Sequence, residues 1–505
     1  MGTTIRAIVA VVSLFVFLSL DFWRVAAAVE EKIPAKVAGA FYSSDPAELS
    51  GQIDRFFLNV PARKLRLDPI ALWVPHAGLM YSGQIAALAY YEVKGRSYDT
   101  IVLVGPSHHM AVPVASIYPR GIFQTPVGEI PIDEALAKKI AAELPDAAFD
   151  PEAYAQEHCL EVQLPFLLKL FPKARVVTIL LGPMDLAMDK RIGQAIAKAC
   201  EGRRVLLIAS SDMSHYPSGP DASKVDENSL NIVRRFDPEL FPGYTEFLMS
   251  TGVKNMACLF CGDGALVAVM EAARRMGADD GMVLGYTNSA EVTGDRARAV
   301  GYGAAAFYKN PRGSSLGKAN SLSFFENPEG RAQALALARN TIESRAAGAG
   351  KSMNISPQNP EFFRPQRIFV TLKKDGRLRG CVGNPQTALP LYEAIIRMAT
   401  AAGFQDSRFS PLTAQEAKAV KIEISVLGNF RRASSPDEIK MGTHGVIVRQ
   451  GSREGLFLPE VAEMIPDKDE FLDILCEEKA GLPAKAWKDS KTELWTFTTL
   501  HFEES

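Results

Sequence analysis

A chain of 505 residues is too long for a single hydrophobic core, so two or three domains are expected. Hydrophobic residues make up 47% and charged residues 23%, as is ordinary for globular protein, and 56 Lys and Arg nearly balance 58 Asp and Glu. The net charge of −2 provides no broad basic surface, so we expect no nucleic-acid partner and no electrostatic attachment to anionic lipid.

Residues 1–28 have the pattern of a secretory signal peptide or an uncleaved N-terminal anchor. Arg6 precedes a charge-free, mostly apolar run over 7–20, and three alanines at 26–28 form a small-residue cleavage site. The run is short for a spanning helix, which needs about 20 apolar residues. We therefore expect an exported chain, periplasmic or extracytoplasmic, with a membrane anchor if the segment is retained. Six cysteines are too few to predict a disulfide scaffold.

Residues 29–309 alternate short β-rich runs with helical segments, such as 137–145 and 191–202. This order predicts an α/β domain with a central, mostly parallel or mixed sheet flanked by helices. Several runs are apolar without strict alternation, which is typical of strands covered on both faces. The predicted strands are 69–74, 100–104, 174–182, 203–210, 281–287 and 302–309.

A linker and a second domain follow. Residues 310–324 are rich in Gly, Ser, Asn and Pro and lack periodicity, so they are predicted to be a linker. Residues 325–505 mix helices and strands without regular alternation, which favours an α+β domain. The predicted helices are 331–348 and 468–480, and the predicted strands lie within 367–383, 418–428, 444–451 and 453–462.

Polar residues follow three apolar strands of the first domain directly. His76 follows "IALWV", His108 and His109 follow "IVLVGPS", and Asp212 and His215 follow "VLLIASS". Because ligands in open α/β sheets bind outside the carboxyl ends of strands, we expect these five residues to converge on one crevice. Each histidine alone is more often structural, but the repeated placement favours a metal or active site.

Cys261 is the candidate thiolate for such a site. It precedes a helix predicted to begin near Ala265, whose positive end would lower the thiol pKa. Imidazole suits Zn, Cu, Fe and Ni, and two histidines with one thiolate would leave an open, catalytic metal position. The alternatives are an inert buried cysteine or a disulfide with Cys258.

His158 and Glu161 lie three residues apart in "AQEHCLEVQLPFLLKLF", a predicted helix over 155–171, and so share one face. An imidazole and a carboxylate there can relay protons or support metal ligands. The alternative is an ordinary helix start, where Glu157 and Glu161 favour the helix dipole.

The segments "VPHAGLMYSG", "LVGPSHH", "EHCLEVQLPFL" and "SSDMSH", with the Cys261-Gly262 pair, resemble the Memo-like family from about 36 to 308. Its bacterial members are called AmmeMemoRadiSam system protein B. The resemblance implies the fold of the class III extradiol dioxygenases, which are ring-cleaving non-haem iron enzymes. It also implies metal binding by His76, His108 and Cys261, with Asp212 and His215 lining the same cleft.

The second domain resembles the AMMECR family, whose bacterial members are AmmeMemoRadiSam system protein A. The motifs "LRGCVG", "DSRFSPL", "KIEISVL", "GTHGVIV" and "FLPEVA" carry this resemblance over 325–505. The whole chain thus resembles a fusion of the B and A proteins. The resemblance implies a radical SAM enzyme as the partner.

Cys381 and His444 both lie in Gly-flanked turns of the second domain and form a candidate nucleophile–base pair, with Arg379 as an anion-binding candidate. We favour the structural alternative, a buried cysteine, a histidine bonded to the backbone, and an ion-paired arginine.

The leading hypothesis is a metal-dependent redox or dioxygenase-like protein that acts on an unknown small molecule or peptide. Its metal ligands would be those that the family resemblance implies, His76, His108 and Cys261. Iron or copper is favoured as the metal, and zinc is possible. His215 or His158 would be the acid–base residue, oriented by Asp212, with His109 and Glu161 as supporting residues. The alternatives are a non-catalytic cleft that binds a peptide or small anion, and a zinc hydrolase that activates water.

Overall fold

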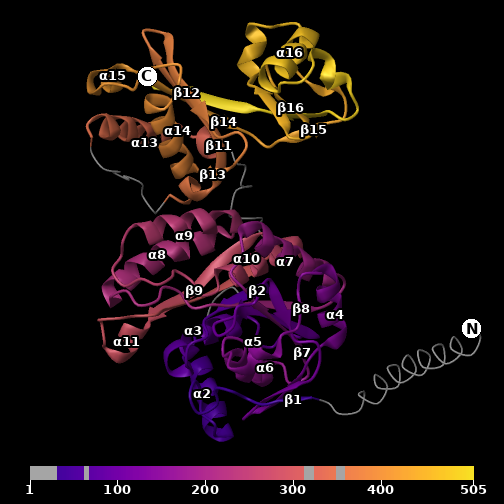
Figure 1. Cartoon of the computed structure of the whole chain (residues 1–505). Helices are drawn as coiled ribbons and strands as arrows, with labels where there is room; N and C mark the ends of the chain where they lie inside the picture. Colours follow the sequence, from indigo (N-terminus) through magenta and orange to yellow (C-terminus); the bar gives the residue numbers. More distant parts are fainter. Residues whose placement is uncertain (1–30, 62–67, 312–322, 349–358, 505) are drawn as a thin grey trace, which may run out of the picture. The chain divides into compact units, whose positions relative to one another are not determined.

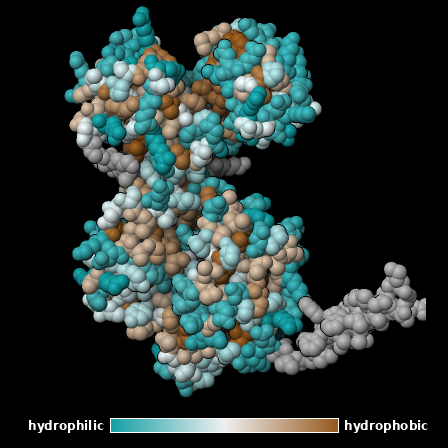
Figure 2. All heavy atoms as spheres, viewed as in Figure 1, coloured by the Kyte–Doolittle hydropathy of each residue, from teal (hydrophilic) through white to brown (hydrophobic). Residues whose placement is uncertain are grey.

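The structure is a computed structural model that describes residues 31–61, 68–311, 323–348 and 359–504. The chain divides into two compact units (Figure 1). The first unit comprises Met1–Pro238 and Val253–Gly313, and the second comprises Glu239–Gly252 and Ser314–Ser505. On the face drawn in Figure 2, hydrophilic residues predominate in the second unit and apolar residues form small patches.

A seven-stranded sheet forms the centre of the first unit. In spatial order its strands are β4 (Ala115–Ile117), β7 (Arg175–Leu181), β3 (Thr100–Pro106), β8 (Val205–Ser210), β2 (Pro69–Val74), β10 (Gly301–Tyr308) and β9 (Asp280–Asn288). The strands β7, β3, β8 and β2 are parallel, whereas β4, β10 and β9 are antiparallel to their neighbours. Every residue of β8 and β10 is buried, as their apolar sequences predict.

Helices cover both faces of this sheet. They are α2 (Pro46–Leu58), α3 (Leu79–Glu92), α4 (Glu134–Glu143), α5 (Pro151–Ala155), α6 (Leu164–Leu170), α7 (Leu186–Ala199), α8 (Gly219–Arg235), α10 (Asp263–Arg275) and α11 (Ser289–Thr293). The crossovers β2–α3–β3 and β7–α7–β8 move across the sheet in opposite directions, so right-handed connections place α3 and α7 on opposite faces. The helix α3 packs on α2 and β10, α7 packs on α4 and α10, and α8 packs on β9. The predicted α/β architecture, a central sheet flanked by helices, is confirmed.

Two local features of this unit differ from the sequence prediction. A small sheet of β1 (Lys32–Ile33), β5 (Ile122–Thr125) and β6 (Gly128–Pro131) was not predicted, because such short strands leave no clear alternation. The predicted helix over 155–171 is wrong in its first half. A loop follows α5, and a 3₁₀ turn η1 (Glu161–Gln163) leads into α6.

The second unit contains two antiparallel sheets. One has the order β12 (Arg377–Gly383), β11 (Pro365–Lys374), β14 (Lys421–Leu427) and β19 (Thr499–Glu503), with β13 (Leu389–Pro390) beside β11. The other has the order β15 (Arg431–Ala433), β18 (Glu493–Phe497), β16 (Gly445–Gln450) and β17 (Arg453–Phe457). Both Asp375 and Gly376 have positive φ, at 51° and 74°, which suits the tight hairpin between β11 and β12.

The helices of the second unit pack mainly on the first of these sheets. The helix α14 (Leu391–Phe404) packs on β11 and β12, and α13 (Pro328–Ala346) packs on α14. The remaining helices are α9 (Phe241–Ser250), α12 (Ser323–Glu326), α15 (Ala414–Ala419) and α16 (Lys468–Ile474). Most of the predicted linker lies outside the described residues, and its last two residues begin α12.

The localisation prediction is corrected. Among the described residues, no helix is both long and apolar enough to cross a membrane, which contradicts the expected exported, possibly anchored chain. The predicted signal peptide or anchor at 1–28 lies outside the described residues.

Candidate metal centre

Loops after three neighbouring parallel strands meet at one edge of the central sheet. His76 follows β2, His108 follows β3, and Asp212 and His215 follow β8, the strand between those two. His158 reaches the same place from the loop between α5 and η1. Of the five residues expected to converge, His109 lies farther out, and His158 joins the others from outside the sheet.

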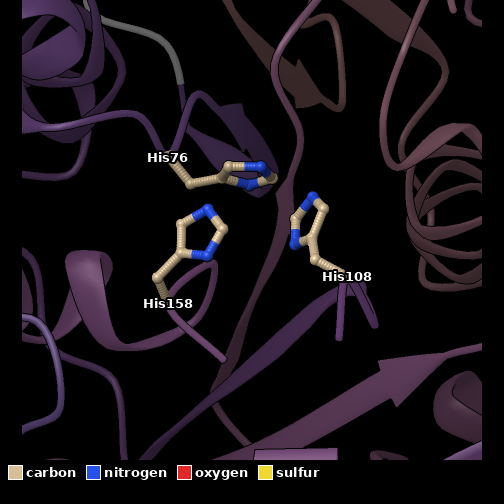
Figure 3. A group of neighbouring side chains, drawn as sticks. All are labelled: His76, His108 and His158. Carbon is tan, nitrogen blue, oxygen red and sulfur yellow. The ribbon is translucent and has the colours of Figure 1, made fainter. Parts of the chain in front are cut away.

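The rings of His76, His108 and His158 face one another (Figure 3). Their centroids are 5.1 Å apart for His76 and His108, 5.4 Å for His76 and His158, and 4.7 Å for His108 and His158. One ring nitrogen from each lies within 4.8 Å of the others, so this histidine cluster can hold a metal ion. His158, predicted as an acid–base residue, lies among the possible ligands.

Hydrogen bonding fixes the proton on the buried His76 ring. The hydroxyl of Ser210 donates to the carbonyl oxygen of Cys159 at 2.7 Å and accepts from Nε2 of Gln163 at 3.0 Å. A hydroxyl has one proton, so the 3.1 Å contact from His76 Nδ1 to Ser210 Oγ requires Nδ1 to donate. Nε2 of His76 therefore carries a lone pair, which can bind a metal or accept a proton from a neighbouring donor. Burial, with repulsion from His108, also lowers the pKa of His76 well below its ordinary value.

The orientation of Gln163 is fixed in turn. The carbonyl oxygen of Pro75 only accepts, so the side-chain atom of Gln163 that lies 2.9 Å from it is the amide nitrogen Nε2. The Oε1 atom of Gln163 then accepts from the Tyr90 hydroxyl at 2.8 Å. Gln163 and Tyr90 are fully buried. This chain of bonds is the kind of support that orients a metal-binding histidine.

Glu157 supports the other two histidines. Its carboxylate accepts from the amide of His108 at 2.7 Å and from Nδ1 of His108 at 2.9 Å, and lies 3.3 Å from Nδ1 of His158. It also accepts from the amides of His158 and Cys159, at 2.9 and 3.0 Å, and these bonds hold the loop that follows α5. Burial opposes ionisation, but bonds and charge from His108 lower the pKa of Glu157. With Nδ1 facing a carboxylate, each ring turns Nε2 toward the cluster.

Sequence reasoning placed Glu157 only at a helix start and missed this role. The signal in the sequence is the position of Glu157 directly before His158, but the predicted helix over 155–171 assigned Glu157 to the helix dipole instead. The pKa of His158 is lowered to about 4, mainly by burial and then by the charge of His76, so the ring is neutral near pH 7.

Cys261 lies directly against His76, with Sγ 3.1 Å from Nε2. The Sγ atom also accepts from the amide of Asp212 at 3.2 Å. The expected lowering of its pKa by the helix α10 is wrong. Burial raises the pKa of the Cys261 thiol well above its ordinary value, and the neighbouring Asp212 raises it further. The thiol is therefore protonated in the absence of a metal.

Asp212 and His215 occupy different positions around the cluster. Asp212 accepts from the backbone amide of His76 at 2.7 Å, so it holds a ligand candidate. His215 is oriented instead by the carbonyl oxygen of Met213, which accepts from Nδ1 at 2.8 Å. Because a carbonyl only accepts, Nε2 of His215 carries a lone pair and can take up a proton.

The two predicted supporting residues lie farther out. His109 is exposed, with its ring 6.2 Å from the His158 ring. Glu161 accepts from the amides of Lys36 and Val37 and from the hydroxyl of Tyr42, at 2.7, 3.0 and 2.6 Å. It therefore anchors the segment at 36–42, whose Phe41 ring packs 4.6 Å from the His158 ring.

Each candidate of the second unit has a different described partner. Cys381 lies in β12 and its Sγ accepts from the Thr371 hydroxyl at 3.3 Å, whereas Nδ1 of His444 accepts from the Lys440 amide at 3.2 Å. Arg379 pairs with Glu416 at 3.4 Å. Within the described part of the chain, no hydrogen bond or ion pair joins Cys381 to His444.

Comparison with known proteins agrees with this organisation. A profile of Memo-like proteins matches residues 34–306. The chain belongs to the Memo-like family. A profile named AMMECR1 matches residues 335–502, so the predicted fusion of a Memo-like half with an AMMECR half is confirmed.

Two proteins named as MEMO1 family members each cover about half of this chain. A MEMO1 family protein of Caldivirga maquilingensis is 34% identical over 285 residues, covering 54% of this chain and 98% of the relative. A second, from Methanocaldococcus jannaschii, is 33% identical over 286 residues, covering 53% and 96%. A solved structure of an uncharacterized Pyrococcus horikoshii protein is 34% identical, with a TM-score of 0.32, and the match covers 34% of this chain and 90% of that one. The radical SAM partner and the small-molecule or peptide ligand stay predictions.

Proposed function

We propose that the Memo-like half binds one redox-active metal ion, iron or copper, at the histidine cluster and is a dioxygenase-like oxidoreductase. The observation that carries the proposal is three imidazoles with a nitrogen of each within 4.8 Å. Hydrogen bonds to Ser210 and Glu157 hold the other nitrogens of His76 and His108, and Nδ1 of His158 lies 3.3 Å from the Glu157 carboxylate. Imidazole is a ligand that iron, copper and zinc all accept. The family resemblance to ring-cleaving iron enzymes favours iron, and a thiolate ligand from Cys261 would favour copper, zinc or electron-rich iron.

Iron or copper supplies one-electron chemistry when bound. The chain's own residues bind, orient and move protons. His215 accepts a proton at Nε2 because Met213 fixes the other nitrogen. Phe41 covers His158 and restricts water on that side. The Cys261 thiol lies 3.1 Å from Nε2 of His76 and becomes a further metal ligand if it loses its proton on metal binding.

A zinc hydrolase is the second candidate, because catalytic zinc sites also use three histidines with an open position for water. Here His215 would be the base that takes a proton from that water. The identity of the bound metal separates the zinc hydrolase from the iron or copper oxidoreductase.

The test is elemental analysis of the full chain, purified without a metal-affinity tag. We expect near-stoichiometric iron or copper, lost in His76→Ala and His158→Ala and retained in His109→Ala, the matched exposed control. Cys261→Ser is expected to weaken binding without abolishing it. Zinc in place of iron or copper would support the hydrolase and contradict redox chemistry. No binding after anaerobic addition of Fe(II), Cu(I) or Zn(II) would overturn both.

A further inference from the structure

An arginine and an exposed tyrosine lie beside His215. The Arg298 guanidinium lies over the Tyr216 ring, 4.4 Å from its centroid, and the His215 ring lies 5.5 Å from the Tyr216 ring. Among the residues that the structure describes, no carboxylate lies within ion-pair distance of Arg298. A cation without a partner anion here is a candidate recognition group.

The backbone of Tyr216 is strained. Its φ is +74°, in the left-handed region that a residue with a bulky side chain rarely adopts. The Tyr216 amide donates to the Ala299 carbonyl at 2.7 Å, and the Ala299 amide donates to Pro217 at 2.8 Å. These bonds fasten Tyr216 to the segment that carries Arg298. Since Tyr216 as a residue is 41% exposed, core packing does not account for the strain.

One short stretch links this pair to the histidine cluster. Asp212 is 4% exposed and holds the His76 amide, His215 is half-buried, and Tyr216 is exposed. Exposure thus rises along 212–216 from the cluster toward solvent. Arg298 and Tyr216 therefore lie on the solvent-exposed side of His215.

We propose that Arg298 and Tyr216 recognise the carboxylate of a small organic acid that reaches the histidine cluster. This inference rests on the proposed function for the identity of the reacting site. A guanidinium stacked on a ring uses its face, so the N–H groups at its edge stay available for a bidentate carboxylate. The Tyr216 and His215 rings offer flat apolar surface to the body of the acid.

The probe is benzoate, compared with benzamide, its uncharged isostere, titrated against the full chain near pH 7. We expect tighter binding of benzoate, and a roughly three- to tenfold loss of benzoate affinity in Arg298→Gln with benzamide affinity unchanged. Arg296→Gln, in the same exposed loop, is the matched control and is expected to bind benzoate as the parent chain does. Both sites are exposed, so neither change threatens the fold.

Equal affinity for the two probes, no saturable benzoate binding, or benzoate binding unaffected by Arg298→Gln would overturn the inference. Inorganic phosphate that competes as well as benzoate would overturn its assignment to a carboxylate. Metal content measured in the same samples separates the two proposals. If the chain binds metal but does not bind benzoate, only the recognition role is overturned. If the chain binds benzoate through Arg298 but takes up no metal, only the proposed function is overturned.

Discussion

Glu157 in the first unit and Asp406 in the second are buried carboxylates with closely similar surroundings. Glu157 accepts three backbone amides and Nδ1 of His108. Asp406 accepts the amides of Cys381 and Arg408, at 2.9 and 3.2 Å, and two nitrogens of the Arg408 guanidinium, at 3.0 and 2.8 Å. Bonds from His108 and Arg408 respectively keep both carboxyl pKa values below their ordinary range, against the opposing effect of burial.

The difference lies in what the partner can still do. An imidazole held at Nδ1 retains a lone pair on Nε2, whereas a guanidinium has only donors. The Glu157 arrangement therefore presents ligands to a metal, while the Asp406 arrangement closes on itself. Similar carboxylates thus build a candidate site in one unit and a structural contact in the other.

Removing each carboxylate gives the largest expected effect. Glu157→Ala leaves four donors without acceptors and is expected to cost about 2–4 kcal/mol of stability. It also frees the rings of His108 and His158, so metal affinity should fall roughly 10–100-fold. Asp406→Ala should cost about 1–3 kcal/mol, because the Arg408 side chain is 55% exposed and water replaces part of the pair.

Urea unfolding and metal content, measured on both variants, check this contrast. Asp406→Ala is the control, because it removes a buried carboxylate that is distant in the sequence from every candidate metal ligand. Its metal content is expected to equal that of the parent chain. Equal metal loss in the two variants would show that general destabilisation, not ligand orientation, explains the effect of Glu157.

Opposite pH dependence sharpens the comparison. Burial raises the pKa of Asp226 in the first unit to about 7, against lowering by bonds from Tyr286 and Ser214. Its unfolded value is about 3.9, so its contribution to stability is complete below that pH and is lost as pH rises toward 7. Asp406 has a lowered folded pKa, so its contribution is complete above about pH 4 and is lost only in acid.

Thermal melting between about pH 5 and pH 8 should therefore show a decline that Asp226→Asn reduces and Asp406→Asn leaves in place. Each pKa unit is equivalent to about 1.4 kcal/mol, so the change in slope is measurable. Asp189, whose pKa burial also raises to about 7, titrates in the same window, so part of the decline remains. An unaltered slope in Asp226→Asn would show that its carboxyl titrates normally in the folded chain.

Strand order made much of the site predictable, and local loop geometry made the rest unpredictable. His76, His108 and Asp212 follow buried apolar runs, and the sheet rule alone brings them together. His158 could not be placed this way, because its loop exists through hydrogen bonds to Glu157 that leave no periodic signal. The raised pKa of Cys261 reflects burial beside Asp212, which only the packed structure reveals.

The smallest expected effect concerns Cys381 and His444. Burial raises the pKa of the Cys381 thiol, which opposes a role as a nucleophile. His444 contacts a local amide, and no described bond couples the two residues. Cys381→Ser and His444→Ala should therefore act independently, with a coupling energy below about 0.5 kcal/mol in a double-mutant cycle of urea unfolding. A coupling above about 1 kcal/mol would place the two side chains in contact and restore the nucleophile–base pair as a hypothesis for the second unit.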